Sequence, residues 1–233
     1  CPDCPTGEES HNLNTDTSDP PAGSPAPRAG RIPTAASPEQ ILFAVPSITD
    51  DDVAAVTAVL RSGWITTGSE AQLLEAELAA YLGAEHVIAV SSCTAALEIA
   101  LAHLELPAGA RVGVPAWTFI SSALAAVHNN LHPVLLDVEP DTLNLSPTAL
   151  EAALTEGLDA VVAVHFGGVA VDRRVHKLCA DAGVPLIEDA AHALGTSDER
   201  GLVGGHGTYA ACFSFYATKN LTSAEGGAIA TDD

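Results

Sequence analysis

The stretch HVIAVSSCTAALEIALAHLELPAGARVGVPAWTFISSALAAVHNN, residues 86–130, decides the fold class. It contains two short apolar runs, 86–92 and 111–115, and each is followed by a longer segment with apolar residues at helical spacing. The short runs are apolar at nearly every position, which is typical of strands buried on both faces of a parallel sheet. Two strand-then-helix units in succession predict an α/β architecture.

The same alternation continues through the rest of the chain. Further strands are predicted at 132–138, 159–166 and 184–189, with helices at 146–154 and 175–183 between them. Two more helices are predicted upstream, at 47–63 and 69–83, and both end at a glycine. Thr49 and Asp52 have the spacing of a capping box at the start of the first. We expect a three-layer sandwich in which helices cover both faces of a mostly parallel sheet.

Groups capable of chemistry follow several of these strands. In sheets of this kind, ligands bind at the carboxyl ends of the strands. The segments at these positions are Ser92-Cys93-Thr94, 115–119, 165–168, 188–192, and the run from Ser214 to Lys219. We therefore expect one site that is built from these loops.

Lys219 is the strongest single indication of chemistry. It is one of only two lysines in the chain, and it lies in FSFYATKNLTSAEGG (213–227) among aromatic, hydroxyl and glycine residues. A lysine in partly apolar surroundings pairs with an acid, loses its proton or forms an imine with a carbonyl compound.

Each of the other groups also has a structural explanation when it is taken alone. Ser92 and Thr94 can cap a helix, although the same geometry offers backbone N–H groups to an anion. Asp189 can cap the helix that follows its strand. His192 can be a hydrogen-bonded core histidine, Trp117 and Phe119 can be core aromatics, and His165 can be a loop residue with no chemical role.

Taken together, these groups meet the requirements of pyridoxal phosphate. That cofactor needs a lysine for a Schiff base, a carboxylate beside its ring nitrogen, a phosphate cradle of hydroxyl and helix N–H groups, and an aromatic side chain on its ring. The carboxylate matters most, because a protonated ring stabilises the carbanion that forms when the substrate's α proton leaves.

Four segments, VSSCTAALEIAL, VPAWTFI, IEDAAHALG and SFYATKNLTSAEGGAI, resemble in this order the DegT/DnrJ/StrS family of pyridoxal-phosphate aminotransferases, over residues 43–233. The resemblance implies fold type I, with the large cofactor-binding domain at 41–233 and a small C-terminal domain absent from this sequence. It implies a homodimer that transfers an amino group from a glutamate-type donor to a nucleotide-linked keto sugar. The products would be amino sugars for cell-surface polysaccharides or antibiotics.

The resemblance also implies three catalytic residues. Lys219 matches the family's Schiff-base lysine, Asp189 the partner of the ring nitrogen, and His192 the residue near the cofactor's phenolic oxygen. The EGG turn at 225–227 matches a turn whose glycines we expect to allow a close backbone approach.

Further residues match positions that bind the cofactor. They are Ser92, Cys93, Thr94 and Ser214 for the phosphate, and Phe119 for stacking on the ring. Trp117, two residues before Phe119, stays an alternative for stacking. Cys93 departs from the pattern, which has glycine at this position, so a side chain stands where backbone approaches the ligand.

Other functions remain open at this stage. Some relatives dehydrate a sugar, but they carry histidine in place of the lysine, and Lys219 argues against that reaction. A non-sugar aminotransferase or an aldolase of the same fold type is an alternative, because the substrate-contacting domain is missing. A truncated protein that binds the cofactor without catalysis is another.

The composition of the chain argues against several classes of binding partner. The formal net charge is −21, with 30 acidic and 9 basic residues among 233, which argues against binding to nucleic acid or anionic membranes. No apolar run approaches the roughly 18 residues of a membrane span, and the sequence does not begin with a signal-peptide pattern. Five scattered cysteines favour free thiols in a reducing compartment. From these observations we expect a soluble, cytoplasmic protein.

The first 40 residues are rich in proline, serine and aspartate, and we expect a disordered tail there. Cys1 and Cys4 resemble half of a zinc site, but no second Cys/His pair follows, so we expect no metal. The chain lacks methionine and stops at AIATDD directly after a predicted strand, so we expect that both natural ends lie beyond it.

Overall fold

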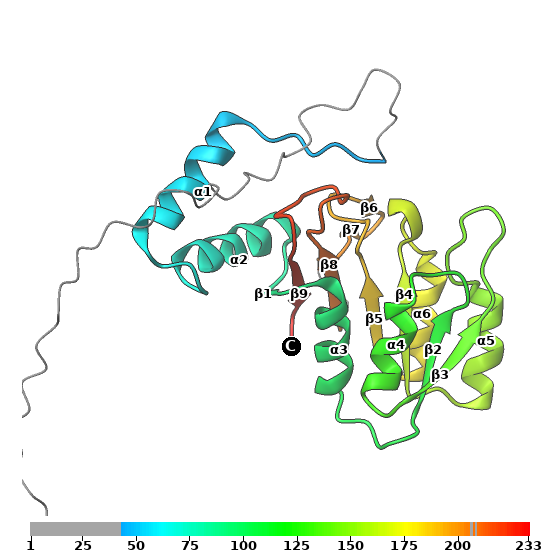
Figure 1. Ribbon diagram of the computed structural model, residues 1–233. Helices are drawn as coiled ribbons and strands as arrows, with labels where there is room; N and C mark the ends of the chain where they lie inside the picture. The colour runs from blue at the N-terminus through cyan, green and yellow to red at the C-terminus, as the bar shows by residue number, and fades with distance from the viewer. Residues whose placement is uncertain (1–42, 206, 208) are drawn as a thin grey trace, which may run out of the picture. The chain divides into compact units, whose positions relative to one another are not determined.

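The central sheet has seven strands in the part of the chain described by the computed structural model, which covers residues 43–205, 207 and 209–233 (Figure 1). The strand order is β1-β9-β8-β5-β4-β2-β3. The bounds are β1 His86–Val90, β2 Arg111–Pro115, β3 His132–Leu136, β4 Ala160–Val164, β5 Leu186–Asp189, β8 Ala210–Ser214 and β9 Gly227–Thr231. Only β9 runs against the others, and it pairs antiparallel with both β1 and β8. The predicted mostly parallel sheet is confirmed.

The helices begin and end where the sequence signals place them. Their bounds are α1 Asp50–Ser62, α2 Ser69–Leu82, α3 Cys93–His103, α4 Ser121–His128, α5 Pro147–Glu156 and α6 Arg173–Ala182, with a 3₁₀ turn at Phe166–Gly168. The capping box of Thr49 and Asp52 opens α1, and Gly63 ends it in the left-handed region at φ 76°. A small hairpin, β6 Ser197–Asp198 and β7 Gly201–Leu202, was not predicted, because strands of two residues leave no periodic pattern.

Alternate strand residues build the two sides of the core. On one face, Val112, Val114 and Val162 pack in a cluster with residues of α3 and α4. On the other face, Val161 and Ala163 pack with α5 and α6. Leu78 and Leu82 of α2 pack with β8 residues Ala211 and Phe213, which face away from the α3 side. The three-layer sandwich is therefore confirmed (Figure 1).

The apolar stripe of α1 behaves differently from the expectation for a core-facing helix. Val53, Val56 and Leu60 share the predicted spacing, yet all three are more than half exposed, and α1 has no buried residue. The capping box and the left-handed glycine therefore define this helix locally, without support from the core.

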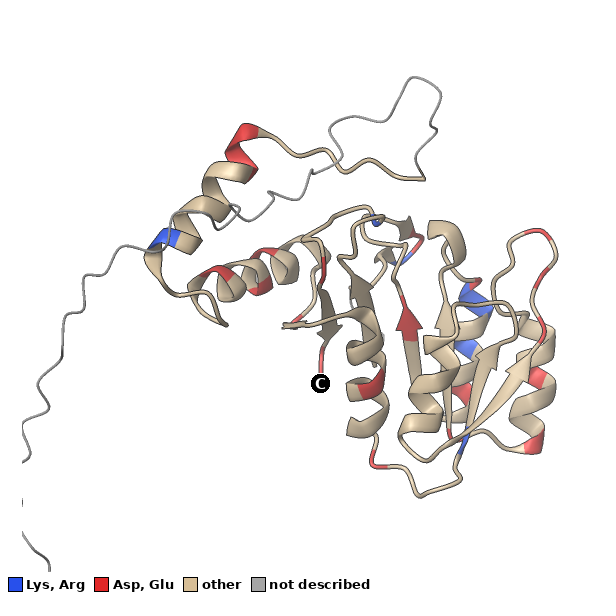
Figure 2. Ribbon diagram, viewed as in Figure 1, with Lys and Arg blue, Asp and Glu red and all other residues tan. Residues whose placement is uncertain are grey.

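Acidic and basic residues are spread along the described ribbon, and acidic positions outnumber basic ones (Figure 2). The basic residues of α6 all pair with acids, as in Lys177 Nζ to Asp181 Oδ2 at 2.6 Å. Within the described ranges no helix has the length and apolarity needed to cross a bilayer, and no group of metal-ligating side chains is found. Cys93, Cys179 and Cys212 are free and buried, whereas Cys1, Cys4 and the expected tail lie outside the described residues.

Candidate active site

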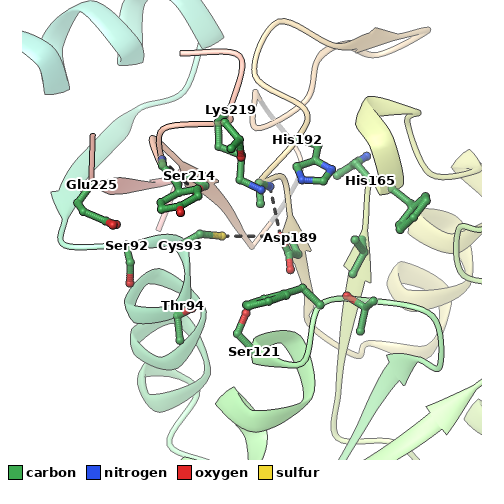
Figure 3. Close-up of a pocket in the computed structure, with 18 of the residues that line it drawn as sticks. Ser92, Cys93, Thr94, Ser121, His165, Asp189, His192, Ser214, Lys219 and Glu225 are labelled. Carbon is green, nitrogen blue, oxygen red and sulfur yellow. Dashed lines mark hydrogen bonds between the residues drawn. The ribbon is translucent and has the colours of Figure 1, made fainter. Parts of the chain in front are cut away.

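A cavity of about 590 Å³ lies at the carboxyl ends of the strands, which is a usual size for a cofactor site. Every residue predicted to bind the cofactor lines it: Ser92, Cys93, Thr94, Phe119, Asp189, His192, Ser214 and Lys219. Figure 3 shows that these side chains come from separate elements on three sides of one space. The parallel topology explains the convergence, because it places the ends of β1, β5 and β8 along the same edge of the sheet.

Lys219 is carried by the loop that joins β8 to β9. The Phe215 N–H donates to the Gly226 carbonyl at 2.9 Å and closes this loop, and the Lys219 N–H donates to the Tyr216 carbonyl at 2.9 Å. The side chain is half-buried, and among the described residues its amine has no hydrogen bond or ion pair. Burial lowers the pKa of the Lys219 amine, and the nearby Asp189 carboxylate only partly opposes this effect. The amine is therefore easier to deprotonate than that of a surface lysine.

Asp189 ends β5 and is 5% exposed. Its Oδ2 accepts a hydrogen bond from the Ser122 hydroxyl at 2.7 Å, and its Oδ1 accepts one from the Ala191 N–H at 3.2 Å. Donors on both oxygens orient the carboxylate and suit its ionised form. Asp189 thus offers a fixed negative charge to a cationic ring in the cavity.

The N-terminus of α3 provides the groups that an anion needs. Ser92 caps the helix, and its hydroxyl accepts from the Ala95 N–H at 3.1 Å. The N–H groups of Cys93 and Thr94 come first in the helix and have no partner within it. Gly227 lets β9 pass close by, since a Cβ there would lie 2.5 Å from the Ser92 carbonyl carbon. The expected close approach at the EGG turn is therefore present.

His192 and Phe119 form the more open part of the site. Burial, followed by the positive charge of Lys219, lowers the pKa of the His192 imidazole, while Asp189 opposes this effect. Phe119 lines the cavity with 74% of its surface exposed. Trp117 does not line it, and its ring instead approaches the ring of Phe166 at 6.3 Å between centroids.

Cys93, the departure from the family pattern, lines the cavity and is buried, with 8% of its surface exposed. Its sulfur lies 3.3 Å from the Cys212 carbonyl oxygen and 3.7 Å from Asp189 Oδ1. Burial, then the charge of Asp189, raises the pKa of the Cys93 thiol, so the group stays protonated and acts as a weak donor. The thiol is accommodated because it points toward polar acceptors.

The structure adds a buried polar cluster that sequence reasoning missed. Glu188 is 1% exposed, and its Oε1 accepts from His176 Nε2 at 2.7 Å and from His165 Nε2 at 3.2 Å. The Val171 N–H donates to His165 Nδ1 at 3.1 Å, so the ring proton of His165 is on Nε2. His165 lines the cavity, but its ring is buried and held by these contacts, which the expectation of a loop residue without a role did not include. The acidic residue within an apolar strand was the available signal.

Ser122 was also missed by sequence reasoning. It lies in α4, is fully buried, and contacts the Thr118 hydroxyl at 2.8 Å as well as Asp189. Thr118 and Ser122 are four residues apart, a spacing that places two side chains together where the chain turns helically. Nothing in that spacing indicates a contact with a carboxylate 67 residues away.

The sequence of this chain matches a known protein family. A sequence model described as the DegT/DnrJ/EryC1/StrS aminotransferase family matches residues 46–233. The chain belongs to this family. It is 42% identical over 192 residues to the spore coat polysaccharide biosynthesis protein SpsC of Bacillus subtilis, an alignment that spans 82% of this chain and 49% of SpsC. The chain therefore spans about half the length of this relative.

Two solved structures show the same fold. Spr1654 of Streptococcus pneumoniae in its PLP form, whose name assigns it to the sugar aminotransferases, superimposes with a TM-score of 0.78 at 32% identity, over 83% of this chain and 53% of that one. The 3-amino-5-hydroxybenzoic acid synthase superimposes with a TM-score of 0.76 at 39% identity, over 81% of this chain and 50% of that one. The fold is that of the fold type I enzymes, and the family's cofactor is pyridoxal phosphate (PLP).

The described residues fit this cofactor. The cavity contains a lysine amine with a lowered pKa, a buried carboxylate with donors on both oxygens, and a capped helix N-terminus with hydroxyl groups beside it. Among the described lining residues, Lys219 is the only lysine or arginine, so a phosphate would be held by N–H and hydroxyl groups.

Proposed function

We propose that this chain is the cofactor-binding part of a PLP-dependent aminotransferase that converts a nucleotide-linked keto sugar to an amino sugar, with a glutamate-type amino donor. The observation that supports this proposal most is the convergence of Lys219, Asp189 and the α3 N-terminus on one cavity. These groups come from three distant parts of the sequence, and a purely structural role for each would not require a shared cavity.

When bound, PLP supplies an electron sink that stabilises negative charge at the α carbon of an amino acid. Lys219 Nζ is the group that would bond to the aldehyde carbon of the cofactor, for which the neutral amine is required. Its lowered pKa increases the neutral fraction at a given pH. When the amino donor has taken its place on the cofactor, the free amine of Lys219 would accept the α proton of the donor and would then donate that proton in the next step.

The other residues would hold the cofactor. Asp189 would face the ring nitrogen and retain a proton there, and His192 would lie near the phenolic oxygen. The phosphate would be held by Ser92, Cys93 and Thr94 at the α3 N-terminus together with Ser214. Phe119 would cover the ring, and its position in the cavity lining supports it over Trp117.

The sugar substrate is supported by the relatives. SpsC is named for polysaccharide biosynthesis and Spr1654 for sugar amination, which agrees with an amino sugar as product. The nucleotide linkage, the glutamate-type donor and the homodimer are those that the family resemblance implies. The proposed cytoplasmic location rests on the composition of the chain. Because the chain spans about half of SpsC, the remaining substrate contacts would come from residues outside it.

A second candidate has a specific observation in its favour. The 3-amino-5-hydroxybenzoic acid synthase, at 39% identity, is named for an aromatic product that is not a sugar. A cyclic non-sugar carbonyl compound is therefore the alternative substrate class, with the same roles for Lys219 and Asp189.

An absorption titration tests the proposal. The purified chain is mixed with PLP, its visible band is recorded, and L-glutamate is then added, with the Lys219→Ala variant treated in parallel. We expect a visible band that requires Lys219 and is replaced by the near-ultraviolet band of pyridoxamine phosphate after glutamate is added. A panel of nucleotide-linked keto sugars and cyclic non-sugar ketones then shows which class restores the visible band.

The outcomes separate the alternatives. Restoration by the non-sugar ketones alone would favour the second candidate. A Lys219-dependent band that ignores every amino donor, in this chain and in a longer chain that contains it, would favour a binding protein without catalysis. Absence of any band in both chains would overturn the proposal.

A further inference from the structure

The hydrogen bonds behind Asp189 run in one direction. The Ser122 hydroxyl has a single proton, and an ionised Asp189 can only accept, so that proton is donated to Asp189 Oδ2 at 2.7 Å. The Thr118 hydroxyl, 2.8 Å from the Ser122 oxygen, must then be the donor in that contact. The chain Thr118 to Ser122 to Asp189 thus places two aligned hydroxyl dipoles toward the carboxylate, and such chains strengthen each bond.

Burial makes this contact strong. Ser122 is 0% exposed and Asp189 is 5% exposed, so water competes little for either group. Ser122 does not line the cavity, whereas Asp189 and Thr118 do. Ser122 can therefore act on a bound molecule only through its neighbours, and of its two side-chain hydrogen bonds the one to Asp189, at 2.7 Å, is the shorter.

The other oxygen of Asp189 has different donors. Oδ1 accepts from the Ala191 N–H at 3.2 Å, and the Cys93 sulfur is 3.7 Å away, a long contact for a weak donor. The thiol also lies nearer to the Cys212 carbonyl, at 3.3 Å. The Ser122 hydroxyl is thus the shortest side-chain contact of Asp189.

We propose that Ser122, supported by Thr118, is a positioning residue that fixes the orientation of the Asp189 carboxylate toward the ring nitrogen of PLP. This inference rests on the proposed function, because it takes Asp189 as the partner of that nitrogen. Without the Ser122 hydroxyl, the buried Asp189 Oδ2 lacks its hydrogen-bond donor, and the carboxylate gains freedom to rotate.

The test compares PLP affinity, the visible spectrum of the PLP complex and stability across a set of variants. Ser122→Ala removes the donor, and Thr118→Val removes the second hydroxyl with little change of shape. Ser146→Ala is the matched control, because Ser146 is a buried serine whose hydroxyl donates to a different carboxylate, Glu139 Oε1, at 2.6 Å. Asp189→Asn and the double variant with Ser122→Ala complete a double-mutant cycle.

We expect Ser122→Ala to raise the Kd for PLP roughly tenfold, the usual scale for one hydrogen bond to a charged group, and Thr118→Val to raise it by a smaller factor. The visible band of Ser122→Ala should shift toward that of Asp189→Asn. Ser122→Ala should add little in the Asp189→Asn background, because the charge that it supports is already gone. Ser146→Ala should leave the Kd unchanged even where urea denaturation shows lower stability.

Several results would overturn the inference. One is that Ser122→Ala binds PLP with the original affinity and spectrum. Another is that Ser122→Ala lowers the affinity for PLP equally in the Asp189→Asn background, which would indicate a merely structural role. If Ser122→Ala does not fold, an unchanged Kd and spectrum for Thr118→Val would decide against it. Absence of PLP binding by the unmodified chain and by a longer chain that contains it would overturn the proposed function and this inference together, whereas the earlier results leave the proposed function standing.

Discussion

Glu188 and Asp189 are neighbours on β5, yet their carboxylates serve opposite sides of the sheet. Consecutive residues of a strand point to opposite faces. Asp189 lines the cavity, whereas the Glu188 carboxylate accepts hydrogen bonds from His165 and His176 on the other face. His165 joins the two sides, because its backbone N–H donates to the Asp189 carbonyl at 3.1 Å. The Glu188 cluster thus supports the strand end that holds the proposed catalytic carboxylate.

Glu188→Gln is expected to destabilise the fold by about 2–3 kcal/mol at pH 7, because two buried histidine N–H groups lose a charged acceptor. Burial raises the pKa of Glu188, but the hydrogen bonds from His165 and His176 outweigh it and lower the pKa below its ordinary value of 4.5. A group whose pKa is lower in the folded state stabilises the fold above its unfolded pKa, and this contribution is lost as pH falls.

Urea denaturation of both proteins from pH 7 to pH 3 measures this effect. The difference in free energy of unfolding should shrink below about pH 4.5. A difference that stays constant with pH would contradict the lowered pKa, and equal stability at pH 7 would contradict the role of the cluster.

Covalent capture of PLP should depend on the lowered pKa of Lys219. The neutral amine is the reactive form, so the rate of capture should rise with pH and level off below pH 10.5, the ordinary lysine value. Rapid borohydride reduction followed by peptide mass spectrometry identifies the modified lysine and measures the fraction that has reacted. Lys177→Arg is the control, since Lys177 is exposed and paired with Asp181, and it should leave the profile intact. Capture that persists in Lys219→Arg at another residue would refute the assignment.

The pKa of His192 should respond in opposite directions to its two charged neighbours. Lys219→Gln removes a positive charge and should raise the His192 pKa, whereas Asp189→Asn removes a negative charge and should lower it. Histidine ring signals followed by NMR during a pH titration measure both shifts. Lys177→Gln should leave the His192 pKa unchanged. Shifts of the same sign in Lys219→Gln and Asp189→Asn would show that packing, not charge, governs the His192 pKa.

Phe119→Ala should weaken PLP binding by roughly 2- to 10-fold, the effect of losing an aromatic contact worth about 0.5–1.5 kcal/mol. Trp117→Ala should change the affinity much less, because Trp117 packs near Phe166 and does not line the cavity. A fluorescence titration with PLP compares the two variants. A larger loss for Trp117→Ala would reverse the assignment of the stacking residue.

Local signals predicted much of this protein. The capping box at Thr49 and the left-handed glycine Gly63 lie within a few residues of the helix that they bound. The polar residues at the strand ends could be assigned to one edge because a parallel sheet has a single carboxyl edge. The same logic could not find Ser122, whose partner lies in another strand and whose own helix gives no sign of it.

The sequence by itself determined the alternation of the main strands and helices along the chain, the residues at each strand exit and the family. It could do so because hydrophobic periodicity, helix caps and motifs are properties of neighbouring residues. Only the tertiary structure decided that α1 leaves its apolar stripe exposed, that Phe119 and not Trp117 lines the cavity, and that Thr118 and Ser122 support Asp189. Those features depend on contacts between segments far apart in the chain, and such contacts are set by packing in three dimensions.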